Sequence, residues 1–161
     1  MDYIWTPWRY QYMREVTSGK QPECIFCDAA ARNDDAETLI VYRGAKTFII
    51  LNRYPYTSGH AMIVPYAHVA ELNLCEPEAL YEMMKLAQRV ETALRSNYKP
   101  DGMNLGMNLG RAAGAGVVGH LHLHALPRWI GDANFMTVTG ETRVHPEDLK
   151  ITYERLSKAL A

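Results

Sequence analysis

Runs of apolar residues in the first half of the chain predict three strands. The stretches TLIVYRG (38–44) and KTFIILN (46–52) are rich in β-branched and aromatic residues, and the Gly-Ala turn that separates them indicates a hairpin. HAMIVP (60–65) follows the turn-rich stretch YPYTSG and predicts a third strand. Further along, MNLGMNLG (103–110) alternates Met and Leu with Asn and Gly, which is typical of a half-buried strand.

Between the third and fourth strands, apolar residues recur at intervals of three and four. From Glu76 to about Tyr98, the apolar positions lie on one helical face: Leu80, Met83, Met84, Ala87, Val90 and Leu94. Pro77 favours the start of this helix, and the sequence KPDG ends it. A last amphipathic helix is predicted from Pro146 nearly to the end of the chain. Several antiparallel strands with two or three helices make an α+β domain.

A second alternating stretch, HLHLHALPRW, places three of the six histidines within five residues. In a strand, His120, His122 and His124 would share one face, with aliphatic side chains on the other face. At about 3.3 Å per residue the outer two lie roughly 13 Å apart, so all three cannot bind one metal ion. Either a neighbouring pair binds metal, or the row lines a site for an anionic group.

Composition and charge narrow the class of protein. The 161 residues suffice for one domain with a normal core, and 48% hydrophobic with 22% charged residues is ordinary for a soluble protein. A formal charge of −1 argues against a broad basic surface for nucleic acid. With no signal-peptide pattern and no apolar run of about 18 residues, we expect a cytoplasmic protein without a membrane span. Residues 1–22, rich in Trp and Tyr, are predicted to form an arm on another surface.

Three cysteines and a glycine-rich loop add candidate chemistry. Cys24 and Cys27 form a C-x-x-C pair, which favours metal or redox chemistry, whereas Cys75 is interpreted as structural. The loop RAAGAGVVG (111–119) lacks the glycine order of a known nucleotide loop. Most such loops are simply turns, but this one leads into the histidine row, where its backbone N–H groups can form an anion-binding nest.

The order NRYPYTSGHAMIVP, long helix, NLG and HLHLHALPR resembles the histidine triad family of nucleotide hydrolases and transferases, from about Cys24 to Arg128. The resemblance implies a five-stranded antiparallel sheet with a long helix, and a homodimer that extends the sheet. We therefore expect a histidine triad domain at 23–140 and a C-terminal helical extension at 141–161.

The resemblance also implies roles for individual residues. His122 corresponds to the family's nucleophile, which attacks the α-phosphate of a nucleotide derivative and forms a nucleotidyl-histidine intermediate. His124 and His60 would assist at the phosphate oxygens and the leaving group. Asn52 would contact the ribose hydroxyls and Asn108 the phosphate, although both are equally well interpreted as turn residues bonded to their own backbone.

Many bacterial members of the family carry a structural zinc ion. The corresponding positions here are Cys24, Cys27, His68 and His120, a Cys₂His₂ set that suits tetrahedral Zn²⁺. One histidine of the row would then bind metal, while the other two face the phosphate.

The loop before the triad departs from the family's hydrolase branches, which have a Gln four residues before the first triad histidine. Gly116 stands there in this chain, and the loop is one residue longer, counted from Asn108. This resembles the branch that cleaves diadenosine tetraphosphate with inorganic phosphate, although the hydroxyl residue expected in that branch is absent. Candidate substrate contacts around this loop and after the triad are Ala115, Gly116, Val117, Arg128 and Trp129, the last as a stacking partner for a base.

The sequence thus predicts a nucleotidyl transferase that acts on dinucleoside polyphosphates with phosphate as acceptor. Two alternatives stay open: a hydrolase of dinucleoside polyphosphates or nucleoside phosphoramidates, and a nucleotide-binding protein with little turnover. The intact His122 favours an enzyme.

Overall fold

The computed structural model of the protein describes residues 22–132 and 147–161. Apart from Pro22, the predicted N-terminal arm lies outside the described residues, and so does the predicted boundary near residue 140. In the part that is described, no helix has the length and apolar character that a membrane span requires.

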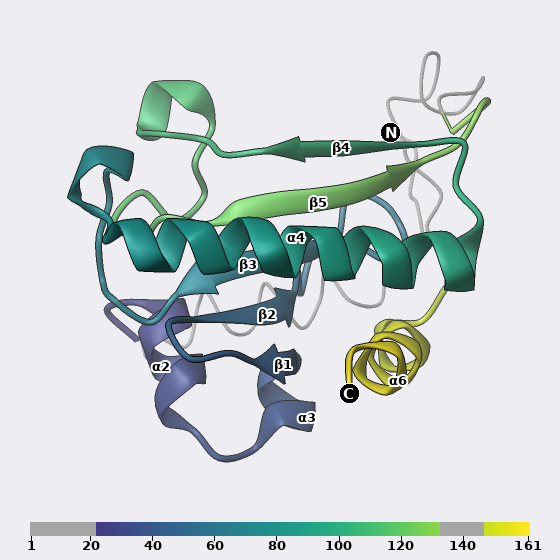
Figure 1. Ribbon diagram of the computed structural model, residues 1–161, viewed down its shortest axis with the longest axis horizontal. Coiled ribbons are helices and arrows are strands. Elements are labelled where there is room, and N and C mark those ends of the chain that lie inside the picture. Colours follow the sequence, from purple (N-terminus) through teal and green to yellow (C-terminus); the bar gives the residue numbers. More distant parts are fainter. Residues whose placement is uncertain (1–21, 133–146) are drawn as a thin grey trace, which may run out of the picture.

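The centre of the molecule is a five-stranded antiparallel sheet with the order β1-β2-β3-β5-β4 (Figure 1). Its strands are β1 (Ile40–Arg43), β2 (Thr47–Leu51), β3 (Ala61–Pro65), β4 (Gly102–Gly106) and β5 (Leu123–Arg128). The first two form the predicted hairpin. The predicted α+β class with a five-stranded antiparallel sheet is confirmed.

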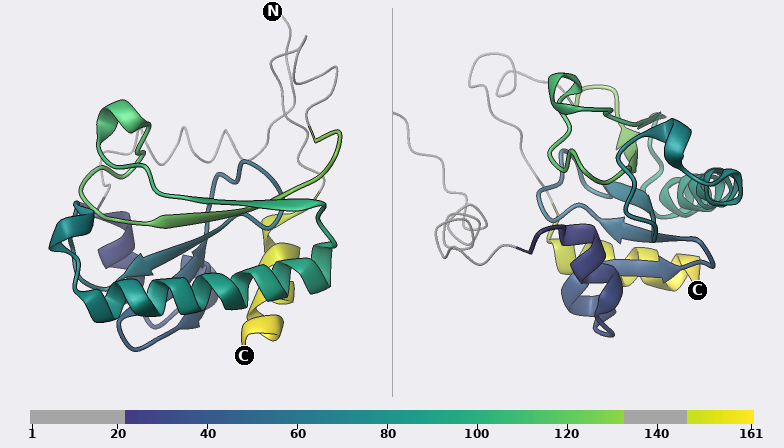
Figure 2. Two further views of the ribbon diagram at one scale, coloured as in Figure 1. Left: turned by 45° about the horizontal axis from the view of Figure 1, so that its top comes forward. Right: turned by 90° about the vertical axis from the view of Figure 1, so that its left-hand side faces the viewer.

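The long helix α4 (Pro77–Tyr98) lies along one face of the sheet, as Figures 1 and 2 show. It begins one residue later than predicted, with Pro77 in its first turn. The C-terminal helix α6 (Leu149–Leu160) packs against α4 and β1, and the side chain of Asp148 caps its start. The residues that this face buries form the main core: Val41, Ile49, Leu51, Ala61, Ile63, Met83, Leu86, Ala87, Val90, Ala93, Leu94, Leu123, Ala125, Leu156 and Leu160.

The opposite face is covered by α2 (Ile25–Ala31), a short helix that we did not expect from the sequence. Its residues Cys24, Phe26 and Ala29 pack with Ile40, Phe48, Ile50, Met62 and Val64 in a second cluster. The even shorter α3 (Asp35–Thr38) follows and leads into β1.

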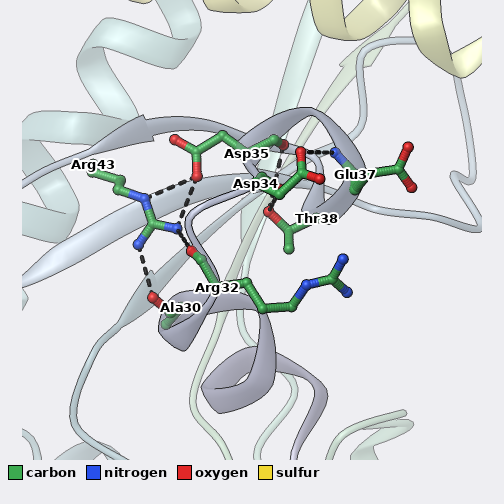
Figure 3. Close-up of polar contacts among 7 residues, drawn as sticks. All are labelled: Ala30, Arg32, Asp34, Asp35, Glu37, Thr38 and Arg43. Atoms are coloured by element: carbon green, nitrogen blue, oxygen red, sulfur yellow. Dashed lines mark hydrogen bonds and ion pairs between the residues drawn. The ribbon is translucent and has the colours of Figure 1, made fainter.

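Arg43, at the end of β1, ties these two helices to the sheet (Figure 3). Its guanidinium donates hydrogen bonds to the backbone oxygens of Ala30 at 2.9 Å and Arg32 at 2.8 Å. It also binds the carboxylate of Asp35 at 2.8 Å. The C-terminal end of α2 is therefore fixed by a side chain from the sheet.

Two predicted strands are shorter than the sequence suggested. The stretch 103–110 is extended only to Gly106, and the chain then turns through Gly110, whose φ of 82° lies in the left-handed region. In the histidine row the regular strand begins at Leu123, so of the three histidines only His124 lies within β5. The prediction of one continuous histidine strand was wrong in this respect.

Candidate active site and metal centre

Pairing between β3 and β5 brings His60 and His124 together. Met62 lies opposite His124 in the register, and His60 directly precedes β3. Side chains two residues apart share a face of the sheet, so His60 and Met62 point to the same side as His124. The Nε2 atom of His60 lies 2.9 Å from Nδ1 of His124.

One backbone contact and the bond between the rings fix the tautomers of His60 and His124. The backbone N–H of Tyr56 donates to Nδ1 of His60 at 3.2 Å, so this nitrogen carries no proton. The proton of neutral His60 is therefore on Nε2, from which it is donated to His124. His124 then carries its own proton on Nε2, the nitrogen that remains available to a substrate. Both ring nitrogens of His60 are therefore engaged, one by the backbone of Tyr56 and the other by His124.

The tautomer of His122 is fixed in the opposite sense. Its Nδ1 lies 2.8 Å from the backbone oxygen of His120, which can only accept a hydrogen bond, so Nδ1 carries the proton. Nε2 then keeps its lone pair. The ring centroids of His122 and His124 are 4.8 Å apart. A nucleophilic nitrogen and a hydrogen-bond donor thus stand side by side.

Burial keeps the active-site imidazoles uncharged. It lowers the pKa of His60 to about 3, with a further contribution from the neighbouring His124 and His122. It also lowers the pKa of His124 to about 4. The pKa of His122 is lowered by burial as well, against the effect of its hydrogen bond to the His120 carbonyl. A neutral imidazole with a free nitrogen is the form that acts as a nucleophile.

Four side chains, one of them from the triad itself, form a group with the composition of a metal site. The donor atoms of Cys24, Cys27, His68 and His120 all lie within 4.8 Å of one another. Cys24 Sγ to His120 Nδ1 and Cys27 Sγ to His68 Nδ1 are each 3.3 Å, and Cys27 Sγ to His120 Nδ1 is 3.6 Å. Donors at 2.0–2.3 Å from a tetrahedral centre are separated by about 3.3–3.8 Å. These three distances lie in that range, and the four side chains offer a Cys₂His₂ ligand set for such an ion.

The orientation of His120 suits it for this role. Its Nε2 lies 2.9 Å from the backbone oxygen of Pro65 and therefore carries the proton, which leaves the Nδ1 lone pair facing the two sulfurs. The structure thus brings the four predicted ligands together on the helix α2, the segment after β3 and the start of the triad.

Two residues at the site were missed by reasoning from the sequence. Phe26 is 1% exposed, and its ring contacts both His120 and His122 at centroid distances of 5.4 and 5.1 Å. Tyr56 is 51% exposed and its ring lies 4.7 Å from that of His60. The position of Phe26 inside the C-x-x-C pair was the only available signal for it.

Of the predicted substrate contacts before the triad, Asn52 is bonded to His60, whose backbone oxygen accepts its N–H at 3.0 Å. The side chain of Asn52 accepts a hydrogen bond from the backbone N–H of Tyr54 at 2.9 Å, which is the local turn interaction considered above. Asn108 is half-buried after β4. In the glycine loop, Ala115 is half-buried, Gly116 is exposed, and Val117 packs against the second cluster.

Arg128 and Trp129 lie at the other end of β5. In the register with β4, His124 is opposite Gly106 whereas Arg128 is opposite Gly102. The guanidinium of Arg128 binds the Asp132 carboxylate and donates to Asn104 at 2.9 Å. The half-buried Trp129 is at the same end. The structure does not bring these two residues together with the triad.

Relatives of known sequence share nearly the whole chain. A protein of Mycobacterium tuberculosis named AP-4-A phosphorylase is 37% identical over 96% of this chain and 82% of its own length. An uncharacterized HIT-like protein of the same species is 33% identical over 86% of this chain and 93% of its own.

Solved structures agree with the fold. A Zn-bound histidine triad family protein from Mycobacterium smegmatis is 30% identical, covers 86% of this chain and 93% of its own, and has a TM-score of 0.67. A hypothetical histidine triad nucleotide-binding protein from Sulfolobus tokodaii is 26% identical, covers 85% of this chain and 91% of its own, and has a TM-score of 0.65. The HIT domain family matches residues 33–129, and the chain belongs to this family of histidine triad proteins.

Proposed function

We propose that the protein is a nucleotidyl transferase that cleaves diadenosine tetraphosphate with inorganic phosphate, through a nucleotidyl intermediate on His122. The observation that carries the proposal is the neutral His122 ring, whose Nδ1 proton is bound by the His120 carbonyl while Nε2 has no hydrogen-bond partner among the described residues. The similarity to AP-4-A phosphorylase over 96% of the chain supports the substrate class.

In the first step, Nε2 of His122 attacks the α-phosphorus and forms a nitrogen–phosphorus bond. The bond from that phosphorus to the bridging oxygen breaks, and ATP leaves. Nε2–H of His124, held toward the site by His60, donates a hydrogen bond to the phosphate oxygens as charge shifts to the leaving group. AMP then remains attached to His122, and no proton has to be removed from the nucleophile beforehand.

In the second step, an acceptor attacks the same phosphorus and releases His122. Water would need a positioned partner to compete, and Ala115 and Gly116 offer no polar side chain for that purpose. Phosphate is already anionic. The backbone N–H groups of Gly116 and Val117 have no backbone partner among the described residues and suit such an anion. Attack by phosphate forms ADP, so the products are ADP and ATP.

Product analysis tests this acceptor. With isotope-labelled phosphate at millimolar concentration, the label should appear in ADP, and AMP should form only slowly when phosphate is omitted. AMP as the main product in both conditions would assign the protein to the hydrolase alternative. Absence of turnover with either acceptor would favour the nucleotide-binding alternative.

A variant of the loop sharpens the same test. A Cβ at Gly116 would meet nothing within 4 Å and this residue is not in the left-handed region, so Gly116→Gln should fold normally. If the missing Gln excludes water as acceptor, this variant should raise the fraction of AMP among the products. An unchanged product ratio would mean that the loop residue does not select the acceptor.

We also propose that Cys24, Cys27, His68 and His120 hold one structural zinc ion per chain. The donor spacing and the free Nδ1 of His120 support this, as does the zinc in the similar mycobacterial protein. Elemental analysis should find about one zinc per chain, and Cys24→Ser should lose it and lower the melting temperature. If the protein contains no zinc, or is equally stable after zinc is removed, the C-x-x-C pair has a packing or redox role instead.

A homodimer is the third part of the proposal. Helices α3 and α6 pack beside β1, at one edge of the sheet, whereas β4 forms the other edge. Leu105 on β4 and Leu109 just after it are 45% and 47% exposed. An edge strand with exposed apolar residues is suited to pair with a second copy of the chain.

A further inference from the structure

One aromatic ring connects the candidate metal centre with the candidate nucleophile. Phe26 belongs to α2 and lies between Cys24 and Cys27 in the sequence. It is almost fully buried, and its ring meets His120 edge-on at 73° and His122 at 48°. The same side chain therefore touches a predicted metal ligand and the ring that is to attack the substrate.

The helix that carries Phe26 depends on contacts at both of its ends. It has seven residues, and no side chain caps its start. A helix of this length is not stable alone in water. At its N-terminal end the two cysteines face His68 and His120, and at its C-terminal end Arg43 binds the carbonyls of Ala30 and Arg32 (Figure 3). The ring of Phe26 is therefore held in a fixed place relative to the sheet.

His122 needs a second constraint besides its hydrogen bond. The bond from Nδ1 to the His120 carbonyl fixes the tautomer, but a single bond lets the ring tilt about it. Among the described residues, two aromatic rings lie against it, Phe26 at 5.1 Å and His124 at 4.8 Å between centroids. His124 is itself held by His60, so Phe26 is the contact that comes from outside the histidine cluster.

We propose that Phe26 is a positioning residue, which holds the imidazole of His122 in the orientation and tautomer required for attack and so couples α2 and its cysteines to the active site. The catalytic consequence rests on the proposed function, whereas the effect on the ring of His122 does not. Phe26 is 1% exposed, so we assign it no contact with the substrate. Its removal should therefore lower kcat rather than raise KM.

The matched comparison is between Phe26→Leu and Phe48→Leu. Phe48 is also fully buried in the second cluster, and the described ring contact that it makes is with Tyr66, at 5.1 Å, not with a histidine. Both substitutions remove an aromatic ring from the same cluster. Only Phe26→Leu should shift the ring ¹⁵N resonances of His122 toward a mixture of tautomers. It should also lower kcat for diadenosine tetraphosphate by about 10- to 100-fold with little change in KM, which is the scale of misplacing a reacting group.

Bound zinc, measured by its release to a chelator, gives a readout that is independent of activity. We expect faster release from Phe26→Leu than from Phe48→Leu, because the ring of His120 loses its edge-on contact. Phe26→Met, which is closer in volume, serves if the leucine variant does not fold. The proposal is overturned if the Phe26 and Phe48 variants have the same His122 resonances and the same zinc release. If the resonances and zinc release differ as expected but the wild-type protein does not cleave diadenosine tetraphosphate, the proposed function fails and the positioning role stands.

Discussion

At the scale of single residues, His60 is a buried imidazole without an acidic partner among its described contacts. It is 1% exposed, faces the rings of His124 and Tyr56, and receives a backbone N–H from Tyr56. Burial and the neighbouring imidazoles lower its pKa to about 3, compared with 6.5 in an unfolded chain. This difference makes the stability of the protein depend on pH.

The sign of this dependence follows from proton binding. Above pH 6.5 both the folded and the unfolded chain hold His60 neutral, and the residue adds no pH dependence. As the pH falls from 6.5 toward 3, the unfolded chain binds a proton that the folded chain excludes. The free energy of unfolding therefore decreases by about 1.4 kcal/mol per pH unit from this residue. Denaturant unfolding between pH 6 and 4 should show a shallower decrease for His60→Asn than for the wild type. Equal slopes would contradict the low pKa.

His122 carries the second prediction at this scale. His122→Ala should remove the covalent route while leaving most phosphate contacts in place, so nucleotide binding should persist. We expect kcat to fall by more than general acid–base assistance alone provides, which is about 10²–10⁴-fold. Steady-state kinetics with calorimetric measurement of nucleotide binding checks both statements. A variant that keeps more than about a tenth of the wild-type kcat would exclude His122 as the nucleophile.

At the scale of elements, the sequence predicted best where a hydrophobic period is long. The 22-residue α4 follows from a period of 3.6 residues, and the β1-β2 hairpin from two β-rich runs separated by a Gly-Ala turn. Within α4, Met83 is buried but Met84 is 54% exposed, because each residue turns about 100° around the helix axis and Met84 falls outside the buried face. The helices α2 and α3, of seven and four residues, are too short to produce a periodic pattern. They are stabilised by tertiary contacts, which a sequence pattern does not contain.

The same reasoning applies to the site. The alternation of His120, His122 and His124 indicated which side chains share a face. The ring of His122 is bonded locally, to the His120 carbonyl, but the hydrogen bonds that fix the other two rings come from segments far away in the sequence. His120 is bonded to Pro65, 55 residues earlier, and His124 to His60, 64 residues earlier. The resemblance to a family indicated the residues, whereas the tautomers could be inferred only from the hydrogen-bond partners in the structure.

Substitution of Arg43 tests whether its hydrogen bonds stabilise α2. Arg43→Ala removes the bonds to Ala30, Arg32 and Asp35, and we expect it to lower the free energy of unfolding by about 1–2 kcal/mol, since the site is partly exposed. It should also release bound zinc faster, because Cys24 directly precedes α2 and Cys27 lies on it. Denaturant unfolding and a chromogenic chelator measure these effects, and Arg43→Lys should restore part of each.

Arg95→Ala is the control for this comparison. Arg95 forms an exposed pair with Glu91 on α4, and a pair of this kind contributes only about 0.3–0.5 kcal/mol. The role assigned to Arg43 is wrong if its alanine variant changes stability and zinc release no more than the Arg95 variant does.

At the scale of the whole molecule, the two faces of the sheet differ in what they pack against. One face packs against α4 and α6 in the main core, and the other carries the histidines under the second cluster with α2. The two edges of the sheet also differ. Since α3 and α6 pack beside β1, the edge that is suited to meet a second copy of the chain is β4.

A charge on β4 should therefore change the oligomeric state. Leu105→Lys places an ammonium group on the edge strand, where lysine opposes strand pairing. Light scattering coupled to gel filtration should show twice the chain mass for the wild type and a shift toward the monomer for the variant. Ile151→Lys is the matched control, because Ile151 is 43% exposed, compared with 45% for Leu105, but lies on α6. Since Leu105 is paired with Ala125, next to His124 on β5, loss of the dimer should also lower activity by loosening this part of β5. A wild-type protein that is already monomeric, or a Leu105 variant that stays dimeric, would contradict pairing through β4.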